Sequence, residues 1–395
     1  MPSSEAPAPI PQKGTQSGRL LHVVIATPYG RRGRSGIDSL TDLVVEKLAL
    51  TPGLARVRTV TTYSPGIRMK TLMPFVFFWS MVRAGYARLR GEVDVMHINV
   101  AGGGSVYRKA VLARFSRMLG VPYVIHIHGS RFHEAWPSDR VALRRVVDEM
   151  LLHSAAIVVL GKYWSDHVTN NLPSVSGKVR IVPNATPTRP VRPQQEHPGG
   201  RVRITFLGAI GERKGSLNLI EALGRLADLP QWEATIAGNG DVSQHQAFAK
   251  SLGISERVEV PGWIDRARAD ELMGNSDIFV LPSFAENLPM AILEAFAHGL
   301  PVVSTPVGAI PDIVEPGVTG LLVRPGDVEG LSQALRQLIE APDVRIAMGN
   351  AARRAHAARF DIADYVDRLI PIWREAAGAT PKSNACVTAL AAGRS

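Results

Sequence analysis

The sequence has one cysteine and no apolar run long enough to span a membrane. Cys386 has no second cysteine to pair with, so an internal disulfide and a zinc cluster of thiolates are excluded, and a reducing compartment fits. Hydrophobic residues reach 45%, charged residues 20% and aromatic residues only 6%, which excludes a chain that is disordered throughout or multi-spanning. At roughly 150 residues per domain, the 395 residues suggest two or three domains.

The sequence also lacks the usual motifs for metal-held or dinucleotide ligands. No Asp-x-Asp occurs, and the nearest pairs are Glu92 with Asp94 and Asp327 with Glu329. The segment at 208–215, GAIGERKG, fits neither the P-loop nor the Rossmann glycine pattern, which disfavours dinucleotide-dependent redox chemistry. We therefore predict no metal and no cofactor, and we expect cationic side chains and helix amides to hold any phosphate.

Two segments bear on targeting to a membrane. Residues 1–18 are rich in Pro, Ser and Ala and have no secretory apolar core, which predicts a disordered leader. Leu72–Val82 is much shorter than the roughly 20 residues of a spanning helix, but it has apolar residues at helical spacing between basic flanks. These apolar residues are Phe75, Phe78, Trp79 and Val82. A helix lying in a membrane interface and a core helix with basic ends both fit this pattern.

The positive charge is concentrated in the first half of the chain. The formal net charge is +10, with 26 Lys/Arg against 11 Asp/Glu in residues 1–195 and 19 against 24 in residues 196–395. A basic half can face nucleic acid, a phosphorylated substrate or an anionic membrane. No nucleic-acid-binding module is recognisable, so we expect no nucleic-acid partner.

The pattern of the chain is alternating strand and helix, twice over. Between the two halves, residues 186–200 carry four prolines and a glycine pair, which predicts a linker. Strands are predicted at Leu20–Thr27, Val57–Thr61, Val93–Ile98, Tyr123–His128, Ala156–Leu160 and Val179–Val182, and then at Val202–Gly208, Glu233–Ala237, Val258–Val260, Ile278–Leu281 and Pro301–Ser304. Helices are expected at Leu40–Leu50 and Ile362–Trp373. The fold class is therefore α/β, with two doubly wound parallel sheets and a ligand cleft between them.

The most informative stretch is Ser283–Gly299, SFAENLPMAILEAFAHG. It follows an apolar strand and opens a helix at Pro289, and an exposed helix start is an anion site. Glu286 in the loop and Glu294 in the helix can accept hydrogen bonds from sugar and ribose hydroxyls. The alternative is that Glu286 is a solvated loop residue and Glu294 a surface residue, although the apolar surroundings of Glu294 in AILEAFA argue against this.

In each half of the chain, a glycine-containing loop follows the first predicted strand. In GAIGERKG, the adjacent Arg213 and Lys214 provide fixed positive charge for a diphosphate. In YGRRGRSGID, Gly30, Gly33 and Gly36 would let the backbone approach a phosphate from the other side of the cleft. A surface loop with three arginines fits the second pattern as well.

Three histidines lie in VIHIHGSRFHE. His126, His128 and His133 suggest a metal, but no cysteine or carboxylate accompanies them at ligand spacing, so a zinc site is disfavoured. His128 ends a predicted strand just before Gly129, at the edge where open α/β sheets bind ligands. A structural role for a single strand-end histidine stays open.

Taken together, these motifs resemble the GT-B retaining glycosyltransferases of family 4. The resemblance rests on the two Rossmann-like units, the Glu-x7-Glu of Glu286 and Glu294, the ERKG loop and the strand-end His-Gly. It extends from about Arg19 to Trp373 and is strongest over Val202–Gly326; VVLGKYWSDHV and VRIVPNA also resemble family segments.

The resemblance implies two domains that face each other across a cleft. Residues 19–185 would form the acceptor domain and residues 201–359 the nucleotide-sugar domain. A terminal helix at 360–376 would pack back on the first domain, before a flexible tail at 377–395.

The resemblance also implies a role for each site residue. Arg213 and Lys214 would hold the diphosphate, assisted by the backbone of Gly36 and of three consecutive residues before the helix. These three are Asn287, Leu288 and Pro289. Glu286 would contact the transferred sugar, Glu294 the ribose, and His128 would lie near the reacting sugar carbon, which makes His128 and Glu286 the expected catalytic residues.

Two positions depart from the family pattern. Ala209 stands where many members have an arginine, so Arg213 is expected to take over its contact with phosphate, and Ser35-Gly36 replaces a glycine pair. The resemblance implies transfer with retention from a nucleotide-diphosphate sugar, without metal.

The expected location at a membrane rests on the basic half and on Leu72–Val82. We expect a lipid-linked or glycan acceptor in polysaccharide or glycolipid biosynthesis, and a peripheral position at the cytoplasmic face of an anionic plasma membrane. Two alternatives stay open, namely a nucleotide-sugar epimerase of the same fold and a non-catalytic protein that binds sugar nucleotides or membranes.

Overall fold

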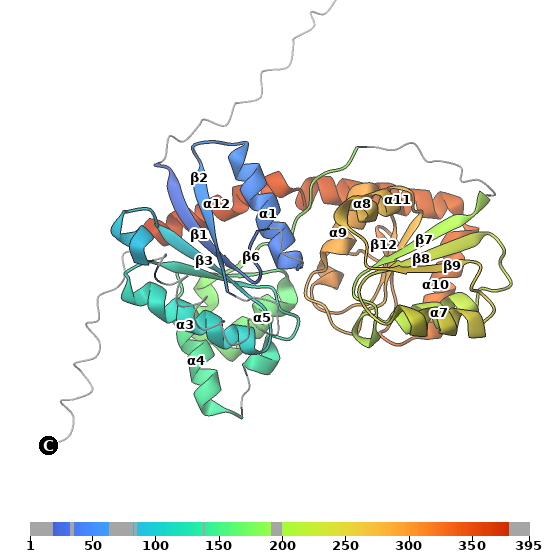
Figure 1. Ribbon diagram of the computed structural model, residues 1–395, viewed down its shortest axis with the longest axis horizontal. Helices are drawn as coiled ribbons and strands as arrows, with labels where there is room; N and C mark the ends of the chain where they lie inside the picture. Colours follow the sequence, from blue (N-terminus) through green and yellow to red (C-terminus); the bar gives the residue numbers. More distant parts are fainter. Residues whose placement is uncertain are drawn as a thin grey trace, which may run out of the picture.

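The computed structural model describes residues 19–31, 35–62, 82, 85–136, 139–190 and 200–378. These residues fold into two α/β units, each built on one six-stranded sheet (Figure 1). All strand pairs given for the two sheets are parallel, which confirms the predicted fold class. Several predicted segments lie wholly or mostly outside the described residues. They are the leader, nearly all of Leu72–Val82, the middle of the linker and almost the whole tail.

The first sheet has the order β2-β1-β3-β4-β5-β6. Its strands are β1 (Leu21–Thr27), β2 (Ala55–Thr61), β3 (Val95–Val100), β4 (Tyr123–Ile127), β5 (Ala156–Val159) and β6 (Val179–Ile181). All six lie where the sequence predicts a strand. The largest shift at a carboxyl end is in β3, predicted at Val93–Ile98, because Asn99 and Val100 continue the ladder against His126 and Ile127.

The second sheet has the order β12-β11-β10-β7-β8-β9. Its strands are β7 (Val202–Leu207), β8 (Trp232–Ala237), β9 (Val258–Gly262), β10 (Ile278–Leu281), β11 (Val302–Ser304) and β12 (Gly320–Leu322). The sequence pattern missed β12, which has only three residues and starts with a glycine, so it presents no apolar run. Gly320 is needed there, because a Cβ would lie 2.1 Å from the carbonyl oxygen of Val302.

Helices cover both faces of the first sheet. They are α1 (Gly36–Ala49), α3 (Gly104–Met118), α4 (Val141–Leu152) and α5 (Lys162–Asn171), with short 3-10 turns η2 (His133–Ala135) and η3 (Pro173–Lys178). Helix α1 begins four residues before the predicted Leu40, because Ser35 caps it and accepts a hydrogen bond from the Asp38 amide. Its start therefore lies at the carboxyl edge of the sheet.

The second unit has its own set of helices. They are α6 (Ser216–Gly224), α7 (Val242–Ser251), α8 (Arg266–Gly274), α9 (Met290–His298), α10 (Val328–Glu340) and α11 (Pro342–Arg359), with the 3-10 turns η5 (Glu212–Lys214) and η6 (Ile310–Asp312). Helix α10 has a strongly apolar face that packs on the core of this unit, where Leu335 and Leu338 are fully buried.

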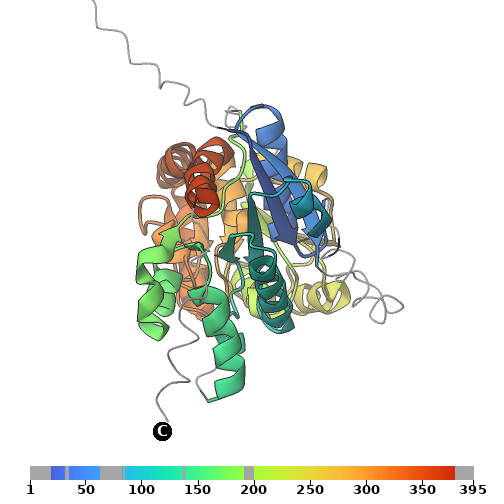
Figure 2. The ribbon, with the colours of Figure 1, turned by 90° about the vertical axis from the view of Figure 1, so that its left-hand side faces the viewer.

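The last helix, α12 (Ile362–Gly378), returns from the second unit to the first. In Figures 1 and 2, α12 and α1 cover one side of the first sheet, and α3, α4 and α5 cover the other. Tyr365, Leu369 and Trp373 of α12 belong to the same buried cluster as Val23 of β1 and Leu43 of α1. Helix α12 is therefore part of the core of the first unit.

Within the described residues, no helix combines the length and the apolar content that a membrane span requires.

Candidate functional site

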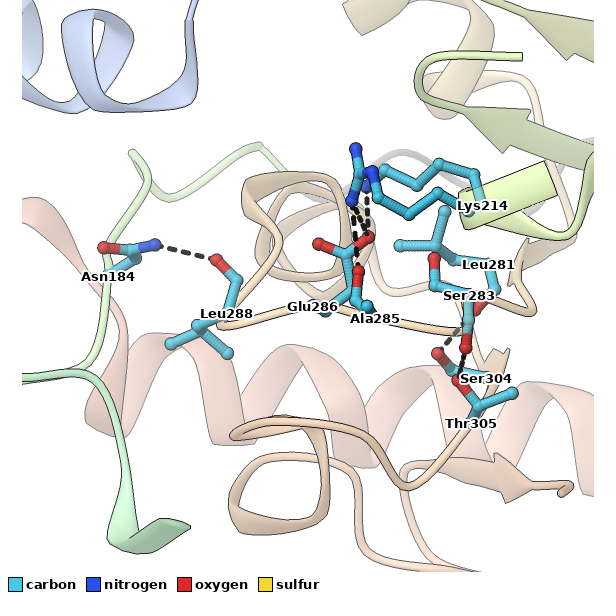
Figure 3. Close-up of polar contacts among 10 residues, drawn as sticks. Asn184, Lys214, Leu281, Ser283, Ala285, Glu286, Leu288, Ser304 and Thr305 are labelled. Carbon is cyan, nitrogen blue, oxygen red and sulfur yellow. Dashed lines mark hydrogen bonds and ion pairs between the residues drawn. The ribbon is translucent and has the colours of Figure 1, made fainter. Parts of the chain in front are cut away.

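The site forms around Glu286, in the loop that joins β10 to α9. Lys214 Nζ lies 2.5 Å from Glu286 Oε1, and Arg213 Nη1 lies 3.3 Å from the same oxygen (Figure 3). The side chains of Glu286 and Lys214 are 9% and 12% exposed, whereas that of Arg213 is 46% exposed. Burial lowers the pKa of Lys214, and the Glu286 carboxylate opposes that shift. The structure thus brings together three of the predicted site residues from two distant loops.

Backbone contacts hold these two loops against each other. The Phe284 amide donates to the carbonyl of Arg213 at 2.9 Å, and the Arg213 guanidinium donates to the carbonyl of Ala285 at 3.1 Å. Gly215, with φ of +67°, lies so close to Pro282 that a Cβ would be 2.2 Å from its carbonyl oxygen. Only glycine fits this backbone conformation and this contact, so the cationic pair is fixed relative to Glu286.

Hydroxyl groups of the neighbouring strand fasten the start of the Glu286 loop. Ser304 Oγ donates to the carbonyl of Leu281 at 2.7 Å, and Thr305 Oγ1 donates to the carbonyl of Ser283 at 2.5 Å (Figure 3). The hydroxyl of Ser283 is itself buried, and among the described residues it has no hydrogen-bond partner.

Helix α9 starts at this loop without a side-chain cap. Pro289 is its N-cap residue, which leaves the first amides of the helix available to an anion. Gly36, at the start of α1 in the other unit, lies opposite; a Cβ on it would be 3.5 Å from Met290. The amino ends of α1 and α9, one from each unit, therefore lie close to each other.

Two asparagines tie this loop to the first unit. Asn287 Nδ2 donates to the carbonyl of Ile127 at 3.2 Å, and Asn184 Nδ2 donates to the carbonyl of Leu288 at 2.8 Å. The side chain of Leu288 is buried in the core of the second unit, so Leu288 contacts Asn184 of the first unit through its backbone carbonyl. Because Ile127 directly precedes His128, the Asn287 contact links the Glu286 loop to the strand end that carries the histidine.

Glu294 lies one turn inside α9 and is half-buried. Burial raises the pKa of this carboxyl group, while Arg266 and Arg189 act in the opposite direction. Among the described residues, no hydrogen bond or ion pair involves its carboxylate, which is free to accept hydrogen bonds from a ligand. Glu294 is therefore only partly exposed, whereas the alternative interpretation treated it as a surface residue.

His128 directly follows β4, at the carboxyl edge of the first sheet. Its Nε2 lies 3.0 Å from Asn99 Oδ1, which makes Nε2–H the donor and leaves Nδ1 without a proton. Burial lowers the pKa of His128 to about 3, so the ring is neutral at physiological pH. The ring of His126 lies 3.9 Å from it, centroid to centroid, and both are on the same face of the sheet.

His133 is separated from these two histidines. It lies on η2, and its ring stacks on that of Trp164 at 6.2 Å between centroids, in contact with the buried cluster that includes residues of α3, α4 and α5. Within the part of the chain that the structure describes, no group of three or more His, Cys, Asp or Glu side chains has an arrangement that could hold a metal ion.

Sequence patterns did not assign a site role to Asn99 or Asn184. Both are polar residues buried near strand ends, at 4% and 5% exposure, which is the signal that could have marked them. His97 and Trp373, which contact each other behind His128, were missed as well.

Two family models match the chain, one for each unit. Residues 17–185 match the model described as Glycosyl transferase 4-like domain, and residues 188–355 match Glycosyl transferases group 1. Alpha-D-kanosaminyltransferase of Streptomyces kanamyceticus is 26% identical over 309 residues, which are 73% of this chain and 79% of the relative.

Solved structures agree in fold. Sucrose-phosphate synthase from Thermosynechococcus elongatus has a TM-score of 0.72 at 18% identity, over 89% of this chain and 98% of the other. HepE of Anabaena, in complex with UDP and glucose, has a TM-score of 0.66 at 18% identity, over 88% and 98%. The two facing units of the chain therefore have the architecture of these enzymes.

Proposed function

Because this chain belongs to the group 1 glycosyltransferases of family 4 and is a nucleotide-sugar-dependent enzyme of GT-B fold, we propose that it takes its sugar from a UDP-sugar and transfers it with retention. The proposed acceptor is a lipid-linked or glycan hydroxyl in the biosynthesis of a polysaccharide or glycolipid. The choice of UDP is supported by HepE, a protein of the same fold that has been solved with UDP and glucose.

The single observation that carries the proposal is the cationic pair held against Glu286 at the start of α9. A diphosphate carries negative charge that Arg213 and Lys214 can stabilise together with the uncapped amides of α9. In this arrangement no metal is needed to neutralise the leaving group. Glu294, one turn further along α9, is proposed to accept hydrogen bonds from the ribose hydroxyls.

We propose that the reaction takes place between Glu286 and His128. The bond from the sugar carbon to the diphosphate breaks, and the acceptor oxygen attacks from the face that the diphosphate leaves. The acceptor proton passes to the departing diphosphate oxygen, so charge and atoms balance. Arg213 and Lys214 stabilise the charge that develops on the leaving group, which is where electrostatic stabilisation lowers the barrier most.

His128 and Glu286 are proposed as the residues that touch the sugar. Neutral His128 has a donor at Nε2 and an acceptor at Nδ1, and it bears no charge that would oppose positive charge on the sugar ring. The Glu286 carboxylate can accept hydrogen bonds from sugar hydroxyls while it stays paired with Lys214.

For the acceptor side, the basic first half supports a position at an anionic membrane surface. We propose a peripheral site at the cytoplasmic face, where Lys and Arg side chains attract anionic lipid. Sedimentation with vesicles of anionic and of zwitterionic phospholipid at low salt is expected to pellet the protein with the anionic vesicles alone. The protein staying in the supernatant with both would remove the membrane part of the proposal and leave the donor part intact.

A thermal-shift panel of UDP-, GDP- and ADP-sugars without metal tests the donor. A ligand that binds the folded state stabilises it, so we expect UDP-sugars to raise the Tm and GDP- and ADP-sugars to leave it unchanged. Glu294→Ala should weaken the shift that UDP-sugars produce. Glu259→Ala, an exposed residue on β9, is the matched control and is expected to keep the full shift. A shift with GDP- or ADP-sugars instead would refute UDP as the donor.

Product analysis separates transfer from the two alternatives. Incubation with a UDP-sugar and an acceptor extract is expected to release UDP and to label the acceptor. Formation of an epimerised sugar without an acceptor would identify an epimerase. Binding without any product would identify a non-catalytic protein that binds sugar nucleotides.

A further inference from the structure

Behind His128, a line of buried aromatic side chains connects the first sheet to helix α12. Trp373 Nε1 donates to His97 Nδ1 at 3.0 Å, and His97 Nε2 lies 3.1 Å from His126 Nδ1. The ring of His126 in turn lies 3.9 Å from that of His128. Trp373 and His126 are fully buried, and His97 is 2% exposed. We call Trp373, His97 and His126 the histidine file.

Hydrogen-bonding rules fix the proton positions along the histidine file. An indole N–H can only donate, so His97 Nδ1 must be the acceptor and carries no proton. Neutral His97 then has its proton on Nε2 and donates it to His126 Nδ1. His126 has its proton on Nε2 as a result, and among the described residues this nitrogen has no partner. One donor on α12 thus determines the tautomers of two histidines.

Charge is excluded from the histidine file by the same burial. Burial lowers the pKa of His97 to about 4 and places that of His126 well below its ordinary value. A neutral His126 ring lies against His128 at a tilt of 37°, whereas it stands at 82° to His97. His128 therefore packs against a ring whose orientation is set by the hydrogen bond from His97.

Helix α12 also approaches His128 at a small cavity. The cavity has a volume of about 10 Å³, no more than a single water molecule needs, and its lining includes His97, Asn99 and His128 from the sheet together with Tyr365 from α12. The helix that supplies Trp373 thus also lines the space beside His128.

We propose that the Trp373–His97–His126 file positions His128, so that the helix returning from the second unit holds the ring of His128 in its productive orientation. The inference rests on the proposed glycosyl transfer, in which His128 touches the sugar. Trp373, His97 and His126 do not touch the substrate themselves and are positioning residues. A misplaced His128 would slow the chemical step without weakening the contacts of the diphosphate with Arg213, Lys214 and α9.

Kinetics of Trp373→Phe give the first test. This substitution keeps an aromatic ring but removes the N–H that His97 accepts, and we expect kcat to fall about 10- to 100-fold while KM for the nucleotide sugar stays within twofold. Trp164→Phe is the matched control, because Trp164 is equally buried in the same unit and its indole nitrogen has no partner among the described residues. Equal effects of the two substitutions would overturn the proposal.

A conservative pair of variants at His97 gives the second test. His97→Gln keeps one oxygen that can accept from Trp373 and one N–H that can donate to His126, whereas His97→Leu keeps neither. We expect the glutamine variant to retain most of the kcat that the leucine variant loses. A leucine variant that folds and keeps wild-type kcat would contradict the positioning role.

Spectra of the imidazole nitrogens test the histidine file without any activity. In ¹⁵N-histidine-labelled protein, long-range ¹H–¹⁵N spectra should show His97 and His126 neutral, with Nε2 protonated and Nδ1 bare. Trp373→Phe is expected to shift the His128 signals, and Trp164→Phe to leave them in place. A proton on His97 Nδ1 would refute the hydrogen bonds proposed for the histidine file. If His97 and His126 are protonated on Nε2 as expected but the protein transfers no sugar, only the proposed function is refuted.

Discussion

Lys214 and Glu286 are each other's counter-ion beside the start of α9, with Nζ and Oε1 2.5 Å apart and both side chains at least 88% buried. Such a pair costs desolvation energy that it recovers only with good geometry. Here the second cation, Arg213, contacts the same carboxylate oxygen. Glu286 neutralises only one of the two positive charges of Arg213 and Lys214. A bound diphosphate would add a second anion, which the remaining charge can stabilise.

The first prediction concerns Lys214. Lys214→Met removes the buried ammonium group and keeps its aliphatic stem, and we expect the affinity for the nucleotide sugar to fall by about 1.5–3 kcal/mol, the usual contribution of a hydrogen bond to a charged group. Titration calorimetry with the nucleoside diphosphate measures this directly. Lys250→Met, on the exposed face of α7, is the control and should bind as the wild type does. Unchanged affinity in Lys214→Met would remove this residue from the donor site.

The second prediction concerns Gly308, which has φ of +60° and lies under the Glu286 loop. A Cβ at this position would be 2.2 Å from the carbonyl oxygen of Glu286, so Gly308→Ala should displace that loop and reduce donor binding at least tenfold. Gly253→Ala is the matched control, because Gly253 has a φ of +71° but open space around it. It should lower the free energy of unfolding by about 1–2 kcal/mol and leave donor binding unchanged. Equal donor affinity in the two variants would contradict the close contact.

The third prediction concerns the tie between the two units. Asn287→Ala removes the hydrogen bond to the carbonyl of Ile127, and we expect a loss of about 1 kcal/mol in the free energy of unfolding. Because the carbonyl belongs to the residue before His128, kcat should fall more than KM for the donor rises. Denaturant unfolding and steady-state kinetics measure the two effects, with exposed Asn170→Ala as the reference. A change in donor KM alone would show that Asn287 acts on the ligand and not between the units.

The fourth prediction concerns acid stability. Burial lowers the pKa of His97 and of His356 to about 4, so below pH 6.5 the unfolded chain takes up protons that the folded chain does not. The stability from these groups is complete above pH 6.5 and is lost as the pH falls towards 4, at about 1.4 kcal/mol per pH unit for each histidine.

Melting curves between pH 8 and pH 4.5 check the acid-stability prediction. His356→Gln should make the decline of Tm below pH 6.5 less steep, because one buried histidine is removed. His153→Gln, at an exposed position, should leave the slope as it is. The same slope in both variants would show that His356 is protonated in the folded state.

Much of the fold could be predicted from the sequence because buried parallel strands are continuous apolar runs. β1 and β10 are such runs, and each predicted strand overlaps an observed one. Glu286 and the cationic pair could be singled out as candidates, since polar residues in short loops after such strands stand out, and Glu294 could be singled out by its apolar neighbours in the helix. β12 could not be predicted, because it has three residues and begins with glycine. It is a strand because it pairs with β11, and its own residues have no strand pattern.

The histidine file shows what a sequence pattern does not contain. His97 and Trp373 are 276 residues apart, and although the family resemblance implies that the terminal helix packs on the first domain, no pattern in either segment indicates that Trp373 will contact His97. The same holds for Asn184 and Leu288, whose contact depends on how the two units face each other. Such contacts come from tertiary packing, which a local sequence pattern does not encode.

The return of α12 also determines when the first unit can complete its folding during synthesis. Among the described residues, helix α12 at residues 362–376 packs on the apolar face that α1 shares with β1 and β3. Residues 362–376 must therefore be synthesised before this part of the core of the amino-terminal half can be buried, whereas the core under α3, α4 and α5 uses residues of that half alone. An amino-terminal fragment ending at residue 185 would expose this face and should aggregate, whereas co-expression of residues 200–378 supplies the missing helix in trans.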